Sequence, residues 1–502
     1  MSKPQTSVVI LGGGPGGYEA ALVAAQLGAR VTVVDSDGLG GACVLTDCVP
    51  SKTLIATSET MVQLRGSDSL GIEIPGASGA GNGDPGSSGR GGAGTRLAAP
   101  GERDWINAPR LYGRVKALAQ AQSADVGARL AAEAVEVVVG RGRLTRLTRP
   151  ARLAGAHAVV VGDREIVADV VLIATGGLPR VLPTARPDGK RILTWRHLYD
   201  LDELPAELVV VGSGVTGAEF ASAYQALGSQ VTLISSRERV LPQEDADAAV
   251  VVEEVFKRRG MTVLSRSRAA AVDREGGGVL VTLTDGRAVR GTHCLMTVGV
   301  VPAIGGIGLA RAGVAVNDRG FIDVDRVSRT SAPGVYAAGD CTGVQMLASV
   351  AAMQGRIAMW HALGEAVQPL RLDHVAATIF TEPEIATVGV AETMIESGQV
   401  KAEVVMLPLV TNPRAKMQGF RDGFVKLFAS PRSGRILGGV VVAPRASELI
   451  LAVSIAVEQL LTVDQLAHTF SVYPSLSGSL TEAARRLMMP ARPRAPFGEP
   501  AQ

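Results

Sequence analysis

The sequence predicts an α/β protein with two Rossmann-like nucleotide-binding domains followed by a C-terminal α+β domain. Two glycine fingerprints, which begin at Gly12 and Gly212, each follow an apolar run and open a helical pattern, as in a βαβ unit. From about Leu370 onward, short apolar runs are typical of the strands of a separate domain. The length of 502 residues allows about three or four domains.

The first fingerprint, Gly12-x-Gly14-x-x-Gly17, predicts a dinucleotide site. Its first glycine makes the turn, its second lets the backbone approach a pyrophosphate, and its third packs the helix on the strand. Asp35 ends the next predicted strand, where its carboxylate can accept hydrogen bonds from ribose hydroxyls. The residues expected to bind here are Gly12, Gly14, Pro15, Gly16, Gly17 and Asp35.

The second fingerprint, Gly212-x-Gly214-x-x-Gly217, is framed by a strand and a helix in the same way. Where an acid would favour NAD, the chain has Ser235, followed by Arg237 and Arg239. A missing carboxylate and nearby guanidinium groups favour the 2′-phosphate of NADPH, although solvated loop arginines are the alternative. The expected binding residues are Gly212, Gly214, Val215, Gly217, Ser235 and Arg237.

The four cysteines are too few for a secreted disulfide scaffold. Cys43 and Cys48 stand five residues apart, in an expected tight turn. They form a disulfide if their Cα atoms come within about 5–6 Å, or they are two small residues that never bond. A helix that starts here would favour a thiolate at its positive end, and Lys52 would add a cation one turn on. Cys294 and Cys341 are predicted to be small buried residues.

Two acidic residues are candidates for the same site. Glu219 lies just inside the helix after the second fingerprint, where its carboxylate either pairs with Lys52 or complements the helix dipole. Asp340 follows an apolar run and Gly339, which suits hydrogen bonding to a sugar-like hydroxyl. No group of His, Cys, Asp and Glu has metal-ligand spacing, so no metal site is predicted.

The rest of the chain supplies the domain organisation. Nearly half of the residues from Pro75 to Gly94 are glycine, which predicts a mobile surface insertion over about 75–104. Helices are expected at 108–130, 446–461 and 479–487, and strands at 378–380, 423–428 and 437–442. The expected domains are 1–184 and 303–368 for the first nucleotide, 185–302 for the second, 369–490 for the C-terminal domain, and a flexible tail at 491–502.

Composition and charge exclude several classes of protein. A net charge of +2 leaves no basic footprint for nucleic acid. No run of about 18 uncharged apolar residues predicts a spanning helix, and residues 1–6 show no export signal. We therefore expect a cytoplasmic protein with no nucleic-acid partner and no membrane span.

Over nearly its whole length the chain resembles the flavoprotein disulfide reductases, the class I pyridine nucleotide-disulfide oxidoreductases. The two fingerprints, the Cys43–Cys48 block with Pro50-Ser51-Lys52, and the segments 174–176, 336–340 and 380–384 stand in that family's order. The resemblance implies FAD at the first fingerprint, NADPH or NADH at the second, and a homodimer through the C-terminal domain. The further FAD-site residues that it implies are Gly41, Ala42, Lys52, Ala174, Thr175, Gly176, Gly339, Asp340 and Ala348, and Gly299 is implied for the nicotinamide site.

The same resemblance assigns the catalytic roles. Cys48 would be the sulfur near the flavin and Cys43 the one that faces substrate, while Lys52 and Glu219 would pair beside the flavin. Asp340 would bind the ribityl-phosphate region.

Three departures from the family pattern matter for function. Tyr473 and Gly478 stand where lipoamide-dehydrogenase-like members carry a histidine and a glutamate. Dithiol chemistry needs a proton carrier that titrates near neutral pH, and a phenol with a pKa near 10 is a poor substitute. Asp47 stands where the family usually has glycine, and an adjacent carboxylate disfavours a thiolate. The segment 299–303 lacks the usual Gly-Arg-x-Pro-Asn residues.

The missing histidine–glutamate pair weighs more than the surviving cysteines. The chain is similar to lipoamide-dehydrogenase-like NAD(P)H:quinone reductases, which also lack the pair; the similar stretches include 192–196 and 348–356. The resemblance implies transfer of a hydride from NAD(P)H to FAD and of electrons to a quinone, with Tyr473 of the other subunit lining the acceptor pocket. The alternatives are a dihydrolipoamide-type or low-molecular-weight disulfide reductase, a soluble transhydrogenase, or a flavoprotein without turnover. The catalytic candidates are Cys43, Cys48, Lys52, Glu219 and Tyr473.

Overall fold

The structure, a computed structural model, describes residues 5–72, 105–146 and 157–488. The insertion predicted at about 75–104 and the tail predicted at 491–502 lie outside the described residues. The described chain forms two compact units. The large unit comprises 5–61, 105–146, 157–238 and 261–371, and the small unit comprises 62–72, 239–260 and 372–488.

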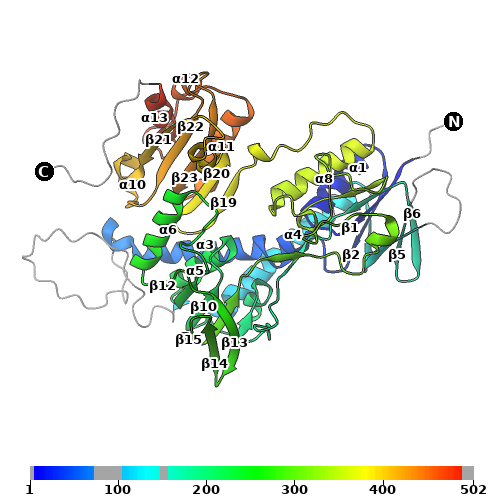
Figure 1. Cartoon of the computed structure of the whole chain (residues 1–502), viewed down its shortest axis with the longest axis horizontal. Helices are drawn as coiled ribbons and strands as arrows, with labels where there is room; N and C mark the ends of the chain where they lie inside the picture. Colours follow the sequence, from blue (N-terminus) through cyan, green and yellow to red (C-terminus); the bar gives the residue numbers. More distant parts are fainter. Residues whose placement is uncertain (1–4, 73–104, 147–156, 489–502) are drawn as a thin grey trace, which may run out of the picture. The chain divides into compact units, whose positions relative to one another are not determined.

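The first sheet of the large unit has the order β18-β7-β1-β2-β3, with all neighbours parallel. Every residue of the central strand β1 is buried, as expected for a parallel sheet covered on both faces. Helices α1 and α8 pack side by side on one face (Figure 1), and the antiparallel sheet β4-β5-β6 contributes to the core of the other. The bounds are β1 (Ser7–Leu11), α1 (Pro15–Gln26), β2 (Arg30–Asp35), α4 (Ala108–Ala132), β3 (Glu136–Val139), β4 (Gly142–Arg146), β5 (His157–Val161), β6 (Arg164–Ala168), β7 (Val170–Ile173), α7 (Leu309–Ala312), β18 (Val335–Ala337), η4 (Asp340–Thr342) and α8 (Ala348–Ala362).

The second sheet of the large unit repeats this plan with the order β12-β11-β10-β16-β9, again parallel. Helix α5 packs on β10 and β11, and the antiparallel sheet β13-β14-β15 shares a hydrophobic core with the sheet. The bounds are β9 (Ile192–Leu193), η3 (Trp195–Asp200), β10 (Glu207–Val211), α5 (Val215–Ala226), β11 (Gln230–Ile234), β12 (Thr262–Leu264), β13 (Ala269–Glu275), β14 (Gly278–Leu283), β15 (Ala288–Gly291) and β16 (His293–Met296). A short antiparallel pair joins β8 (Gly177–Pro179) to β17 (Val300–Pro302).

The small unit is built on the antiparallel sheet β19-β20-β23-β22-β21. Helices α11 and α13 pack on this sheet and share one hydrophobic core with it. The bounds are α6 (Ala246–Arg258), η5 (Leu372–His374), β19 (Ala377–Ile379), β20 (Glu384–Gly389), α9 (Glu392–Glu396), β21 (Glu403–Pro408), η6 (Leu409–Thr411), α10 (Pro413–Met417), β22 (Phe424–Ala429), β23 (Ile436–Ala443), α11 (Ala446–Glu458), α12 (Val463–Ala467) and α13 (Gly478–Leu487).

The predicted fold class is confirmed, because the chain carries two parallel nucleotide-type sheets and a C-terminal α+β part. The helices expected at 108–130, 446–461 and 479–487 are α4, α11 and α13, each within a few residues of the expected ends. The tight turn expected around Cys43 is instead the one-turn helix α2 (Gly41–Leu45), followed by α3 (Cys48–Arg65) and the short η1 (Ser67–Leu70).

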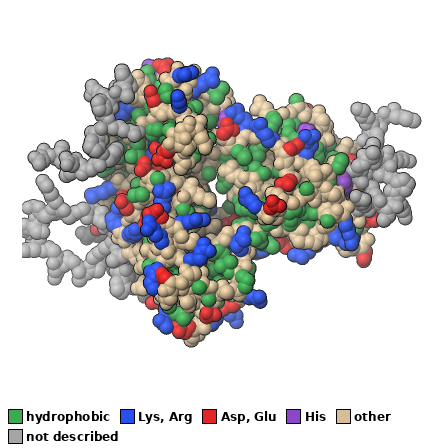
Figure 2. Space-filling view, viewed as in Figure 1, with side chains coloured by type: hydrophobic (Ala, Val, Ile, Leu, Met, Phe, Trp, Pro, Cys, Tyr) green, Lys and Arg blue, Asp and Glu red, His purple; other side chains and the backbone are tan. Residues whose placement is uncertain are grey.

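The surface carries charges of both signs. Figure 2 shows basic and acidic side chains intermingled on one face, in keeping with the net charge of +2. Within the described ranges, no helix is long and apolar enough to cross a membrane.

Candidate functional site

The turn between β1 and α1 forms a cradle for phosphate groups. Gly12 adopts a φ of +101°, and a Cβ there would lie 2.3 Å from the carbonyl oxygen of Ala174. A Cβ on Gly17 would lie 1.8 Å from the carbonyl oxygen of Gly12, so only glycine permits this packing. On Gly14, in contrast, a Cβ would meet no protein atom nearer than 3.9 Å. This open space beside the positive end of α1 fits the pyrophosphate of a dinucleotide such as FAD.

Asp35, at the end of β2, organises the cradle through its carboxylate. Its Oδ2 accepts a hydrogen bond from the N–H of Gly13 at 2.6 Å. Its Oδ1 accepts from the N–H groups of Asp37 and Gly38 at 2.8 and 2.6 Å. Oδ2 keeps a lone-pair direction for a ribose hydroxyl, so the predicted role of Asp35 is compatible with its role in the turn.

The other candidates for the first nucleotide lie at the same sheet edge, because the carboxyl ends of parallel strands share one edge. A Cβ on Gly41 would lie 2.9 Å from the Cα of Gly14, so α2 closes one side of the cradle. The N–H of Gly339 donates to Oε1 of Gln354 at 2.8 Å, which ties α8 to the end of β18. The candidates along this edge are Gly12, Gly14, Pro15, Gly16, Gly17, Asp35, Gly41, Ala42, Ala174, Thr175, Gly176, Gly339, Asp340 and Ala348.

The turn between β10 and α5 repeats the first cradle. Gly212 adopts a φ of +114°, and a Cβ there would lie 2.4 Å from the carbonyl oxygen of Thr297. A Cβ on Gly217 would lie 1.9 Å from the carbonyl oxygen of Gly212, whereas one on Gly214 would meet nothing within 4 Å. The second cradle therefore has the same open phosphate position at the start of α5, which begins at Val215.

The ribose end of the second cradle has hydroxyls in place of a carboxylate. Ser213 donates its hydroxyl to Oγ of the fully buried Ser235 at 2.7 Å. Arg237 is exposed two residues further on and forms no ion pair with a residue that the structure describes. Gly299 adopts a φ of +105°, and its carbonyl oxygen accepts from the N–H of Arg180 at 2.9 Å. The guanidinium group of Arg237 is therefore available to an anion such as a 2′-phosphate.

Cys43 in α2 and Cys48 at the start of α3 are free thiols joined by a side-chain hydrogen bond. The hydrogen bond from Cys48 lowers the pKa of Cys43. The same bond, then burial and the carboxylate of Asp47, raise the pKa of Cys48. The sequence led us to expect two opposing effects here, a helix start that favours a thiolate and an adjacent Asp47 that disfavours it, and at Cys48 the effects that disfavour it are the larger ones. Of the two thiols, Cys43 is therefore the one whose pKa is lowered.

The other two cysteines are buried, as predicted. Cys294 and Cys341 are both inaccessible to solvent. Burial raises the pKa of Cys341 to about 11, so neither its packing nor its acidity suits a nucleophile.

Lys52 and Glu219 form the pair that the sequence allowed. Nζ of Lys52 on α3 donates to Oε2 of Glu219 on α5 at 2.8 Å. Glu219 is only 4% exposed. Burial opposes the charged form of Lys52, but the carboxylate of Glu219 outweighs it, and the pKa of Lys52 rises. The site therefore holds one fixed ammonium–carboxylate pair.

Two further carboxylates lie near this pair. Burial is the main reason that the pKa of Asp47 rises to about 6, and the negative charges of Glu219 and Asp340 raise it further. Burial also raises the pKa of Asp340. The charge of Asp47 acts to raise the pKa of both thiols, as its position beside Cys48 led us to expect, although the pKa of Cys43 is lowered overall. Burial and neighbouring negative charge therefore favour the neutral forms of these carboxyl groups.

Three buried tyrosines beside the pair were missed in the sequence. The hydroxyls of Tyr112 on α4 and Tyr224 on α5 lie 3.2 Å apart and form a hydrogen bond. Tyr199 on η3 is 5% exposed, and its hydroxyl has no hydrogen-bond partner among the described residues. Burial raises its pKa, and the charges of Asp47, Glu219 and Cys48 act in the same direction. No local sequence pattern predicts that these three tyrosines lie together, because they come from three separate elements of the chain.

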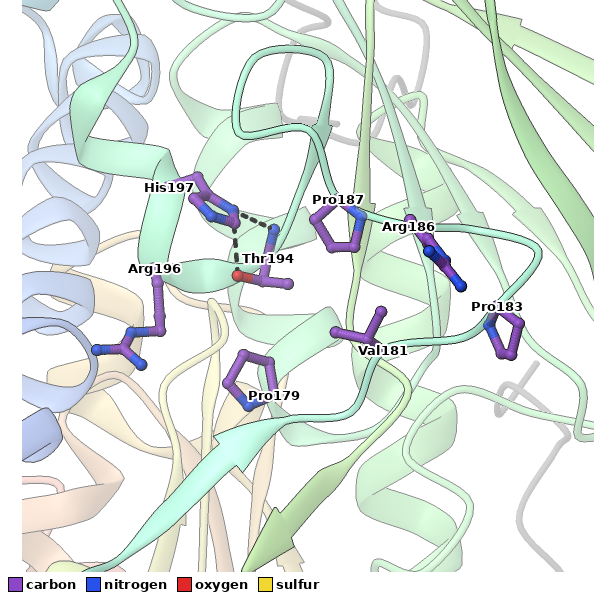
Figure 3. A pocket seen from close by; sticks show the side chains of 8 residues that line it. All are labelled: Pro179, Val181, Pro183, Arg186, Pro187, Thr194, Arg196 and His197. Atoms are coloured by element: carbon purple, nitrogen blue, oxygen red, sulfur yellow. Dashed lines mark hydrogen bonds between the residues drawn. The ribbon is translucent and has the colours of Figure 1, made fainter. Parts of the chain in front are cut away.

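A separate cavity of about 520 Å³ lies beside η3 (Figure 3). His197 accepts hydrogen bonds from the backbone N–H and the hydroxyl of Thr194, at 3.0 and 3.2 Å, on one wall. Arg196 lies 4.0 Å from a carboxylate oxygen of Asp37, two residues beyond Asp35. None of the lining residues is a sequence candidate; they are Pro179, Val181, Pro183, Arg186, Pro187, Thr194, Arg196 and His197.

The small unit holds the last catalytic candidate. Tyr473 is 84% exposed and follows the fully exposed Phe470 and the exposed Val472.

Elsewhere in this unit, carboxylate oxygens of Asp245, Asp247 and Glu392 converge. The ammonium group of the buried Lys426 already bonds these three carboxylates, at 2.8, 2.7 and 2.5 Å, so the group is an ion cluster around one buried lysine.

Comparison with known proteins places the chain in a family. The model of the family described as pyridine nucleotide-disulphide oxidoreductase matches residues 6–355, and the model of that family's dimerisation domain matches residues 375–484.

Individual relatives agree with this assignment. The chain is 55% identical over 488 residues to a Mycobacterium tuberculosis protein named NAD(P)H dehydrogenase (quinone), covering 96% of this chain and 94% of the relative. It is 31% identical to a dihydrolipoyl dehydrogenase of Zymomonas mobilis, covering 95% and 96% of the two chains. The crystal structure of LpdA from Mycobacterium tuberculosis is similar with a TM-score of 0.87 and 54% identity, covering 96% of this chain and all of that one.

Proposed function

The chain belongs to the pyridine nucleotide-disulphide oxidoreductase family, and we propose that it is an FAD-dependent NAD(P)H:quinone oxidoreductase. The family implies a flavin and a pyridine nucleotide, and the two open glycine cradles fit two dinucleotides. Bound FAD would accept a hydride from the nicotinamide and release two electrons to the acceptor. The name of the 55% identical relative also supports a quinone acceptor.

The observation that carries this proposal is the chemistry of the segment from Tyr473 to Gly478. A disulfide reductase needs an imidazole and its orienting carboxylate to protonate the interchange sulfur, and this segment offers a phenol and a glycine instead. In the part of the small unit that the structure describes, a histidine–glutamate pair joins His374 on η5 to Glu458 on α11, outside this segment. Loss of the group that acts as acid and base in thiol interchange typically lowers the rate by about 10²–10⁴-fold.

The remaining candidates have defined tasks in this proposal. The Lys52–Glu219 pair would fix a positive charge beside the flavin ring, and Asp340 would bind the ribityl-phosphate region. Arg237 would select NADPH through its 2′-phosphate. The exposed Phe470, Val472 and Tyr473 support a homodimer through the dimerisation domain, in which Tyr473 would line the acceptor pocket of the partner.

Steady-state turnover with NADPH and 1,4-benzoquinone tests the proposal. We expect NADPH oxidation that depends on benzoquinone and far exceeds the rate with the same concentration of free FAD. The Lys52→Met variant serves as the matched control, because it retains the cradle but removes the ion pair. Wild-type turnover no faster than free FAD would contradict the proposal.

A disulfide reductase is the second candidate, and the lowered pKa of Cys43 favours it. In that case Cys43→Ser would abolish turnover of a disulfide such as lipoamide, and benzoquinone turnover would be slow in both proteins. In a quinone reductase, Cys43→Ser leaves the benzoquinone rate unchanged. Hydride transfer from NADPH to thio-NAD, measured in the same preparations, detects the transhydrogenase alternative.

A further inference from the structure

The cavity beside η3 is lined by none of the residues assigned to the two glycine cradles. Its volume of about 520 Å³ is that of a small-molecule site, for which about 300–1,000 Å³ is usual. Its described lining residues fall within 179–197, the segment of the large unit that runs from β8 through β9 to the start of η3. The cavity is therefore a candidate site for a ligand other than the two dinucleotides.

The loop that forms one wall of the cavity is held in place without a ligand. Oδ1 of Asp188 accepts hydrogen bonds from three successive backbone N–H groups, those of residues 190–192, at 2.8–2.9 Å. Oδ2 of the same carboxylate accepts from the guanidinium group of Arg274 at 2.8 Å. The three prolines of the lining also restrict the backbone, because each fixes its own φ. Little ordering of the chain is then needed when a ligand binds, which favours affinity.

His197 presents a hydrogen-bond donor that has no partner in the described chain. Its Nδ1 accepts from the backbone N–H of Thr194 at 3.0 Å, which is possible only when Nδ1 carries no proton. Burial lowers the pKa of His197, so the ring is neutral and its proton is on Nε2. Nε2 forms no hydrogen bond with a described residue, and its edge of the ring faces Gly189, which has no side chain to cover it. The Nε2–H group is therefore available to an acceptor.

The two ends of the cavity are positively charged. Figure 3 shows Arg186 and Arg196 at opposite ends of the lining, with Val181 and Pro187 between them. Arg186 is exposed and forms no ion pair with a described residue. Arg196 is half-buried, and the carboxylate oxygen of Asp37 lies 4.0 Å away, beyond hydrogen-bond distance. None of the described residues that line the cavity is acidic, so both guanidinium groups can bind an anion.

The stretch between the two arginines is apolar, because it consists of proline rings and the side chain of Val181. Such a wall covers a hydrocarbon body, while a guanidinium group binds a carboxylate or a phosphate through paired hydrogen bonds. An anion the size of one carboxylate reaches only one end of this lining. The arrangement therefore favours a ligand that has an acidic group at each end.

We propose that this cavity is a binding site for an elongated organic dianion, in which an apolar body separates two carboxylate or phosphate groups. One acidic group would bind Arg186 and the other Arg196, and the Nε2–H group of His197 would be a further donor. The site is additional to the cradles for FAD and the pyridine nucleotide, and it does not depend on which electron acceptor the protein uses.

Calorimetric titration of the holoprotein with naphthalene-2,6-dicarboxylate tests the proposal, because this probe carries a carboxylate at each end of a flat apolar ring system. Saturating NADP⁺ is present, so that both cradles are filled. We expect a Kd of about 0.1–1 mM for the probe and about tenfold weaker binding of 2-naphthoate, which lacks one carboxylate. The uncharged naphthalene-2,6-dicarboxamide should not bind measurably. The matched bisphosphate, titrated in parallel, shows which acidic group the site prefers, and either preference supports the proposal.

Four variants locate the probe. Arg186→Gln and Arg196→Gln should each weaken binding of the dicarboxylate about 3- to 10-fold, because both guanidinium groups are partly screened by solvent. Val181→Asp places a carboxylate in the apolar stretch and should abolish binding; Val181 is 52% exposed, so the core is not disturbed. Lys190→Gln removes an exposed cation of the same loop that is not part of the lining, and it should leave the Kd unchanged. The FAD absorbance and circular dichroism of each variant should match the wild type.

Several results would overturn the proposal. They are the absence of measurable binding of both dianions, equal affinities for the dicarboxylate and the dicarboxamide, and wild-type affinity in both arginine variants. Binding that is seen only when NADP⁺ is left out would also overturn it, because the probe would then occupy the second cradle.

Discussion

Lys52 and Glu219 join two helices of the large unit through an ion pair of 2.8 Å, one helix beginning at the thiol Cys48 and the other following the second glycine cradle. The pair thus links the helix that begins at Cys48 to the helix that follows the second cradle, at a point where the carboxylate is almost fully buried. Such a pair fixes a charge that needs no rearrangement during the reaction.

Removing the charge of Glu219 should slow flavin reduction. Glu219→Gln keeps the side-chain shape but leaves the ammonium of Lys52 without its partner carboxylate. We expect the rate of flavin reduction by NADPH, measured by stopped-flow absorbance, to fall about 10–10²-fold. Unfolding in urea should show a loss of about 1–2 kcal/mol, because Lys52 is partly exposed. Glu275→Gln, on the exposed Arg290 pair, is the control; an unchanged rate in Glu219→Gln would refute the role.

The two cradles should respond to the same substitution in different ways. Gly14→Ala places a methyl group in the open space of the first cradle, where the nearest protein atoms lie 3.9 Å away, and Gly214→Ala does so in the second, where none lies within 4 Å. We expect Gly14→Ala to purify with little FAD. Gly214→Ala should keep its yellow colour but raise the Kd for NADPH about tenfold or more, as measured by equilibrium titration. Circular dichroism should show both variants folded, and equal FAD content in the two would contradict the assignment of the cradles.

Arg237 should decide between the two nicotinamide nucleotides. Its exposed guanidinium has no ion partner within the described chain, so it is available to a 2′-phosphate. We expect Arg237→Ala to raise the KM for NADPH about tenfold and to leave the KM for NADH within about twofold. Arg290→Ala removes another exposed arginine, on β15, and should affect neither KM. Equal effects on both nucleotides in Arg237→Ala would show that the arginine is a solvated loop charge.

Asp47 should make stability depend on pH in a direction opposite to that of an ordinary carboxylate. Its pKa is raised from 3.8 to about 6 on folding, so the folded protein binds the proton more tightly than the unfolded chain. The stabilisation is complete below about pH 4 and is lost as pH rises through 6. Asp47→Asn should therefore gain about 2 kcal/mol relative to wild type between pH 4 and pH 8, measured by urea unfolding of the FAD-free proteins. A gain that does not change with pH would show that Asp47 is ionised throughout.

The ion cluster of the small unit should be essential for its folding. Lys426 is 1% exposed, and its ammonium bonds Asp245, Asp247 and Glu392, which together raise its pKa against the effect of burial. Lys426→Met leaves three carboxylates facing one another and should cost about 3–5 kcal/mol in urea unfolding. Lys401→Met, at an exposed position, should cost nothing measurable. A loss below about 1 kcal/mol in Lys426→Met would contradict this.

The sequence was most informative where function depends on local geometry. The roles of Gly12, Gly14 and Gly17 follow from spacing alone, because one turn must provide a positive φ, an open face and a close helix contact. The pairing of Lys52 with Glu219 could be named as one of two options, since each residue opens a helix after a recognisable motif.

The features that were missed depend on long-range packing. Tyr112, Tyr199 and Tyr224 converge from a helix, a 3₁₀ turn and a second helix, and no periodicity connects them. The opposite shifts in the pKa of Cys43 and of Cys48 were also missed, because the hydrogen bond between the two thiols and the burial of Cys48 decide them. Local rules describe a helix terminus but not the groups that tertiary structure places beside it.

Single-turnover reoxidation of the NADPH-reduced holoprotein tests the central claim most directly. The reduced protein is mixed without oxygen with either benzoquinone or lipoamide, and the return of flavin absorbance is followed in the wild type and in Cys43→Ser. A quinone reductase gives rapid reoxidation by benzoquinone in both proteins and negligible reoxidation by lipoamide. Rapid reoxidation by lipoamide that disappears in Cys43→Ser, together with a slow benzoquinone reaction, would contradict the account.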